Sequence, residues 1–272
     1  MYTNQGGQTH RFWGGATVNN AVHEFHDYAT KEGIQTPAHM DILVGVNKQY
    51  GYALMSAQHI ISATAGFITS FFAGPLAQII SFALIDAYLP EVFIGTNFEE
   101  SDRVKWLAYH EIAHASHYIN VGHNFWVELA LSEMVALGHG NQNSPNASLI
   151  ALCESWAEHI GVTFTANTYG SSGSATSDYI NFLERTRNED MNHIPIGFYH
   201  DLIDNVSDSA PAFDYFGGGS GLISDGVSGF TNAEFDGILD NSVDSPFDFK
   251  EKLKEGQPVS VQTAIDALFN SY

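Results

Sequence analysis

The sequence predicts an α+β fold in which a small N-terminal lobe with a sheet precedes a mainly helical central region. Three observations predict this class. Short apolar runs of strand character lie between residues 42 and 95. Apolar residues recur at helical spacing over residues 101–121 and 149–160. The 272 residues are 44% hydrophobic and no Pro-rich or charged linker divides them, so we expect one folded unit over residues 1–272.

The N-terminal lobe is expected to occupy residues 1–100. It starts with a helix over Thr17–Lys31, which Gly33 ends. The apolar stripe of this helix consists of Val18, Val22, Phe25 and Ala29. Short strands are predicted at residues 42–44, 52–55 and 89–95.

Residues 60–85 carry no charged side chain, and their length would suffice for a membrane span. The stretch contains Gly66, Gly74 and Pro75, and almost no Lys or Arg flanks it to set an orientation. This composition favours a buried or cleft-lining pair of segments that breaks near Gly74. Membrane association stays open as the less favoured alternative.

A helix of about five turns is predicted from near Ser101 to Val121. Ser101 and Asp102 suit its N-terminus, and Gly122 is a natural stop. One apolar stripe along it faces a core and consists of Val104, Ala108, Ile112, Ala115 and Ile119.

The same helix carries the run His110-Glu111-Ile112-Ala113-His114, an HExxH motif. His110, His114 and His117 lie on the side opposite the stripe, with Glu111 at its edge. Histidines at i and i+4 lie one above the other and can bind a single metal ion, with the glutamate pointing into the same cleft. A surface helix that carries these residues by chance is the competing interpretation. His117 is expected to face solvent, with a supporting or supplementary ligand role as the alternative.

The third ligand is not supplied by a nearby histidine or aspartate. Position 120 is Asn where a third histidine would stand, and no Asp occurs between Asp102 and Asp178. About 40 residues downstream, Glu154 and Glu158 share one face of a predicted helix. The apolar stripe of that helix consists of Leu149, Leu152, Trp156 and Ile160.

Over residues 101–161 the chain resembles the zincin metallopeptidases of the gluzincin branch, in which a glutamate from a following helix completes HExxH. The string Glu154-Ser155-Trp156-Ala157-Glu158-His159 is similar to the pattern E-G-F-A-x-Y of this branch. It differs from the pattern by Ser in place of Gly, Trp in place of Phe and His in place of Tyr. The resemblance implies a zincin-like fold and a Zn²⁺ site of His110, His114 and Glu154. It makes Glu158 a supporting partner or an alternative ligand.

The same resemblance implies hydrolysis of peptide bonds in a peptide or protein substrate. Zinc with two imidazoles and one carboxylate keeps a position open for water, and Glu111 acts as the general base. Zincins usually add a Tyr or His that stabilises the oxyanion. His193 and Tyr199 are the candidates. A non-catalytic surface or binding protein on a zincin scaffold is the rival function.

Beyond the helical region, assigned to residues 101–205, the C-terminal part over residues 206–272 is expected to be acidic and loop-rich. Its carboxylates make Ca²⁺ a second candidate cation, although no D-x-D-x-D-G loop occurs. A helical pattern near the C-terminus is expected to dock on the core. It consists of Val261, Ala264, Ile265 and Leu268.

Net charge and cysteine content restrict the partners, the location and the disulfides expected for this chain. A net charge of −21 argues against binding nucleic acid. It fits a secreted or cell-surface bacterial protein, and the polar N-terminus does not read as a signal peptide. The single Cys153 forbids an internal disulfide and is expected to be buried. The oligomeric state is left open.

Overall fold

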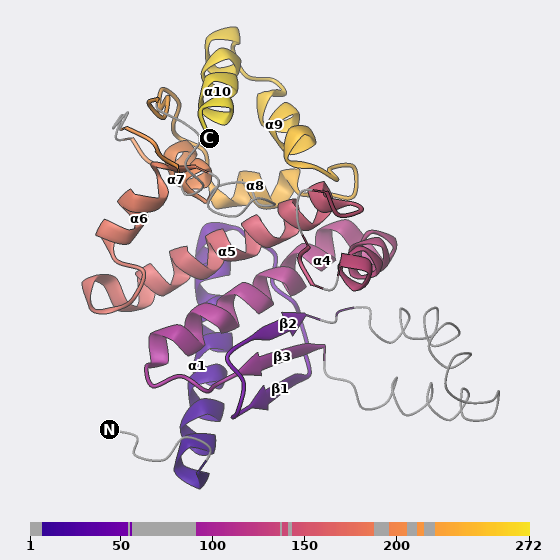
Figure 1. The fold of residues 1–272 in the computed structure, drawn as a ribbon, viewed down its shortest axis with the longest axis vertical. Coiled ribbons are helices and arrows are strands. Elements are labelled where there is room, and N and C mark those ends of the chain that lie inside the picture. The colour runs from indigo at the N-terminus through magenta and orange to yellow at the C-terminus, as the bar shows by residue number, and fades with distance from the viewer. Residues whose placement is uncertain are drawn as a thin grey trace, which may run out of the picture.

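The computed structural model describes residues 7–53, 55, 91–136, 138–140, 143–187, 196–205, 211–214 and 221–272. It is a mixed α+β structure in which helices predominate and a small three-stranded sheet lies beside them (Figure 1). Helix α4 lies between this sheet and helix α5, and the C-terminal helices lie beyond α5. The expected α+β class is therefore confirmed.

The sheet contains β1 (Ile42–Gly45), β2 (Gly51–Ala53) and β3 (Val92–Gly95), close to the three predicted strands. Their order is β1-β3-β2, with β1 parallel and β2 antiparallel to the central β3. All of β3 is buried, as expected for a central strand covered by helices. In this three-stranded sheet β2 is an edge strand, and it lies next to α4.

Helix α1 (Gln8–Glu32) ends at Gly33, whose φ of 75° gives the predicted left-handed C-cap. Its core face includes Val18, Phe25 and Ala29, while Val22 is only partly buried. The helix begins nine residues earlier than predicted. A tertiary contact fixes this first part, because the Nε2 atom of His10 lies 2.7 Å from the carbonyl oxygen of Thr96.

Helix α4 (Ser101–Ala136) contains a break at Gly122, where φ is 75° and ψ is −178°. The predicted stop is therefore real, but the chain resumes a helix directly after it. The expected core positions from Val104 to Ala115 are fully buried. Ile119 is the exception, since 42% of it is exposed in the last turn before the break.

Helix α5 (Ala147–Tyr169) packs along α4 and is buried over most of its length (Figure 1). Cys153 is buried, as predicted. The whole predicted stripe is in the core: Leu149, Leu152, Trp156 and Ile160. Most of α5 is enclosed because α4 covers one side of it and the C-terminal helices cover another.

The C-terminal part is more helical than expected. After α6 (Ser177–Leu183) and α7 (Gly197–Ile203) come α8 (Asn232–Ile238), α9 (Pro246–Lys254) and α10 (Val259–Ser271). Three of these helices begin at capping side chains: Thr176 starts α6, Thr231 starts α8 and Ser245 starts α9. The predicted docking of the last helix is confirmed, because Ile265 and Leu268 are fully buried.

The remaining elements are small. A 3₁₀ turn η1 (Gly170–Ser172) follows α5, and β4 (Thr186–Arg187) pairs in parallel with β5 (Phe213–Asp214). The uncharged stretch at residues 60–85 lies outside the described residues, and so does His193. Among the helices that the structure does describe, none combines the length and apolar character that a membrane crossing needs.

Candidate metal centre

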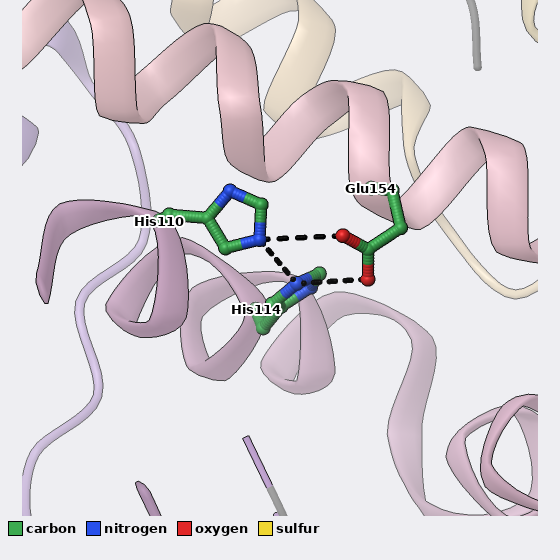
Figure 2. Close-up of side chains that lie close together, drawn as sticks. All are labelled: His110, His114 and Glu154. Atoms are coloured by element: carbon green, nitrogen blue, oxygen red, sulfur yellow. Dashed lines mark hydrogen bonds and ion pairs between the residues drawn. The ribbon is translucent and has the colours of Figure 1, made fainter. Parts of the chain in front are cut away.

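The HExxH residues lie on the first half of α4 and face α5. His110 and His114 are one helical turn apart, so their rings project from the same face of the helix. From α5, the Glu154 carboxylate points at both rings (Figure 2). Its Oε2 lies 3.3 Å from Nε2 of His110 and its Oε1 lies 3.3 Å from Nε2 of His114. The two Nε2 atoms are 3.2 Å apart.

These three atoms form the kind of triangle that a tetrahedral ion requires. Bonds of about 2.0–2.1 Å to nitrogen and oxygen place two ligands of a tetrahedron about 3.3 Å apart. The three sides are 3.2, 3.3 and 3.3 Å. Two imidazoles and one carboxylate also suit zinc by their chemistry. His110, His114 and Glu154 therefore form a cluster that could hold a metal ion.

Burial and mutual charge shape the protonation of the three groups. Burial raises the pKa of Glu154, but His114 and His110 outweigh it and hold that pKa well below its usual range. Burial lowers the pKa of His110, but Glu154 and Glu158 raise it well above its ordinary value. For His114 burial prevails over Glu154, and its pKa is lowered. The cluster thus favours an ionised carboxylate that faces a positive charge.

Of the two glutamates that the sequence left open, Glu154 is the one that faces both Nε2 atoms. Glu158 lies on the other side of the His110 ring, with its Oε2 3.0 Å from Nδ1. It also accepts a hydrogen bond of 3.1 Å from Nε1 of Trp106. A carboxylate on the second ring nitrogen fixes the orientation and basicity of a ligating histidine. Glu158 is therefore placed as a supporting partner.

Glu111 is buried beside this cluster and lines the same cleft. Its carboxylate lies against Gly51 of the edge strand β2, where an added Cβ would approach Oε1 to 2.5 Å. Burial raises the pKa of Glu111 to about 8, and although His110 lowers it, the carboxylates of Glu154 and Glu133 add to the increase. A nearby cation would favour the ionised form instead.

The cleft is walled by β2 on one side and by both halves of α4 on the other. Apart from the motif residues and Glu154, it is lined by Gln49, Tyr50, Gly51, Tyr52, Ala53, Leu107, Trp126, Leu129, Ala130, Glu133 and His139. None of these described residues is Lys or Arg. The cleft therefore combines an apolar lining with several carboxylates and no basic side chain of its own.

Tyr199 does not reach this cleft. It is fully buried in the core, where its ring stacks on that of His159 at 4.7 Å and packs against Phe235 at 5.5 Å. The placement expected of an oxyanion donor is therefore wrong for Tyr199, because its ring packs against Trp156 and His159 of α5 in the core and is not part of the cleft lining. His193 lies outside the described residues.

His117 is fully buried, so the expectation that it faces solvent is also wrong. After the break at Gly122, the second half of α4 brings Phe125 and Trp126 against its ring, with centroids 5.5 and 6.1 Å away. In this apolar surrounding burial lowers the pKa of His117 to about 3, with a smaller contribution from His114. His117 is thus a neutral core histidine behind the cluster.

Two residues of the cleft were not found by sequence reasoning. Glu133, from the second half of α4, and His139, just after α4, form a second group of possible ligands with Glu154. A glutamate six residues before a histidine has no recognised spacing, so no local signal marks them. These two groups are the possible metal sites among the described residues, and the described C-terminal residues contribute no comparable calcium site.

Comparisons with protein-family models, with curated proteins and with solved structures found no match to this chain.

Proposed function

We propose that this protein is a zinc-dependent peptidase with a gluzincin-like centre on a zincin-like fold. The observation that carries the proposal is the triangle of His110, His114 and Glu154, with sides of 3.2 to 3.3 Å and Glu111 buried next to it. Glu111 supports an enzyme over a non-catalytic scaffold, because a metal-binding scaffold would not need it.

The residues divide the chemistry between them. His110, His114 and Glu154 would hold the ion, and Glu158 orients His110 through its second nitrogen. A zinc ion so held supplies a Lewis acid for the scissile carbonyl and makes water more acidic. Glu111 then takes a proton from the attacking water and passes it to the leaving amine. This role requires its carboxylate to be ionised, which a nearby cation favours.

The edge strand supports a peptide as the substrate. In the three-stranded sheet β2 pairs with β3 on one side, and β2 contributes Gly51, Tyr52 and Ala53 to the cleft lining. An extended peptide can add to such an edge by main-chain hydrogen bonds. The absence of a side chain at Gly51 lets the Glu111 carboxylate lie close to this edge. A peptide aligned on β2 would therefore pass Glu111 and the metal cluster.

The proposal is tested with the parent chain and Glu111→Gln. Zinc content is measured after desalting, and hydrolysis is measured on a peptide library. The parent should contain at least one zinc ion per chain and cleave peptides. Glu111→Gln should keep its zinc and lose activity by about 10²–10⁴-fold, the usual contribution of a general base.

Glu99→Gln is the matched control, because Glu99 is exposed and is not among the residues that line the cleft. It should retain both zinc and activity. A parent chain without zinc, or a Glu111→Gln variant as active as the parent, would contradict the proposal. Zinc without any hydrolysis in the parent would favour the non-catalytic scaffold.

A further inference from the structure

The cleft lining holds two possible ligands that the zinc centre does not use, Glu133 and His139. Nε2 of His139 lies 3.5 Å from Oε1 of Glu154, whose other oxygen faces His110. A carboxylate oxygen of Glu133 joins them, with the three ligand atoms within 4.8 Å of one another. Tetrahedral ligands lie about 3.3 Å apart, so His139 and Glu154 are already near that spacing, and closure needs the Glu133 carboxylate to move by at most about 1.5 Å.

The Glu133 carboxylate has no hydrogen bond or ion pair within the described part of the chain, although it is largely buried. Its electrostatic neighbour is the carboxylate of Glu154, which carries the same charge. A buried carboxylate without a positive partner is costly. The cleft lining contains three carboxylates, Glu111, Glu133 and Glu154, and no Lys or Arg, so bound cations are the partners that would balance these carboxylates when they ionise.

Glu154 is placed to serve two ions at once. Its Oε2 faces His110 at 3.3 Å, while its Oε1 lies between His114 at 3.3 Å and His139 at 3.5 Å. Bridging carboxylates of this kind hold pairs of ions about 3.5–4 Å apart in two-metal hydrolases. One imidazole and two carboxylates suit zinc, manganese or cobalt.

We propose that Glu133, His139 and the shared Glu154 form a second divalent-metal site beside the zinc centre. The inference rests on the proposed function through Glu154, which belongs to both sites. Glu133 and His139 are specific to the second site, so variants at these positions separate the two.

The test counts metal ions per chain by native mass spectrometry after the chelated protein is reloaded with zinc and desalted. The parent should carry two zinc ions. His139→Ala and Glu133→Gln should each carry one, a loss of half the metal. His23→Ala is the matched control, since His23 is exposed on α1, and it should keep two. Thermal unfolding of each metal-free variant checks that the fold is intact.

A parent chain with one zinc ion that still cleaves peptides would overturn the second site and leave the peptidase proposal standing. Two ions in the parent and in both variants would also overturn it, because the second ion would then lie elsewhere. A parent without zinc would overturn both proposals. If Glu133→Gln alters cleavage of positively charged peptides while the parent holds one ion, Glu133 binds a substrate cation instead.

Discussion

Two pairs of histidines lie on opposite sides of α5 and differ in what surrounds them. His110 and His114 line the cleft and face the Glu154 carboxylate at 3.3 Å. His159 and His200 lie toward α7 and α8, with ring centroids 4.9 Å apart. There the Nε2–H of His159 donates a hydrogen bond of 2.8 Å to Oδ1 of Asn232, a neutral amide.

The comparison shows that burial alone does not distinguish a histidine of the metal cluster from one in the core, whereas the group that it contacts does. All four rings are largely enclosed. Burial lowers the pKa of His159 to about 4, and it lowers that of His200 well below the usual value. Burial also lowers the pKa of His114, but two carboxylates, Glu154 and Glu158, raise that of His110.

The largest effect is expected from Glu154→Ala, which removes the carboxylate that both cleft histidines face. The metal content after desalting should fall to less than about a tenth of the parent value, because structural zinc binding depends on the full ligand set. Plasma mass spectrometry measures it. Glu99→Ala, on the exposed surface, should leave the metal content unchanged. Parent-level zinc in Glu154→Ala would refute the assignment of this ligand.

His159→Ala should give the opposite pattern. The ring is fully buried and stacks on Tyr199, so truncation leaves a cavity and an unpaired Asn232. We expect a loss of about 2–4 kcal/mol in the free energy of unfolding, with the zinc content unchanged. Urea unfolding measured in the presence of a chelator gives the first quantity. Loss of zinc with unchanged stability would contradict the assignment of His159 to the core and place it with the metal cluster.

Glu158→Gln should weaken the metal centre without abolishing it. The carboxylate contacts Nδ1 of His110 at 3.0 Å, and partners of this kind typically contribute 10–100-fold in metal affinity. Competition with a chromophoric chelator should show a loss of about that size. A loss as complete as that of Glu154→Ala would instead make Glu158 a direct ligand.

The smallest expected effect is a change in the pH dependence of stability. The pKa of His159 is about 4 in the folded chain against 6.5 unfolded. Between these values the unfolded state binds more protons, so stability is present above pH 6.5 and is lost as the pH falls toward 4. From pH 7 to pH 5.5 this group should contribute a loss of about 1 kcal/mol.

The check compares the parent with His159→Gln, which keeps an amide donor for Asn232 but does not titrate. Its unfolding free energy, measured with the metal removed, should fall less between pH 7 and pH 5.5. The groups that face His159 are His200 and Tyr199 from α7 and Asn232 from α8, which also donates to Glu32 of α1. Equal slopes in the two proteins would assign the pH dependence to His200 or another group.

Local sequence patterns predicted much of the framework. The stripe from Val104 to Ala115, the stop at Gly122 and the buried Cys153 depend on helix periodicity and on glycine geometry, which neighbours in the chain determine. The prediction was wrong for Ile119, because in the last turn before the break Val121 is buried and Ile119 is exposed. The helix starts at Thr231 and Ser245 were missed because capping side chains resemble ordinary loop residues in an acidic segment.

By itself the sequence determined the spacing of His110, Glu111 and His114, because one helical turn fixes which side chains share a face. It could also place Glu154 and Glu158 on one face of a second helix. Only the tertiary structure decided which glutamate meets the Nε2 atoms, since that depends on how α5 packs on α4. The tertiary structure also decided that Glu133 and His139 lie close to Glu154. Their position depends on the break in the helix at Gly122, and helical periodicity in the sequence does not predict the new direction of the chain.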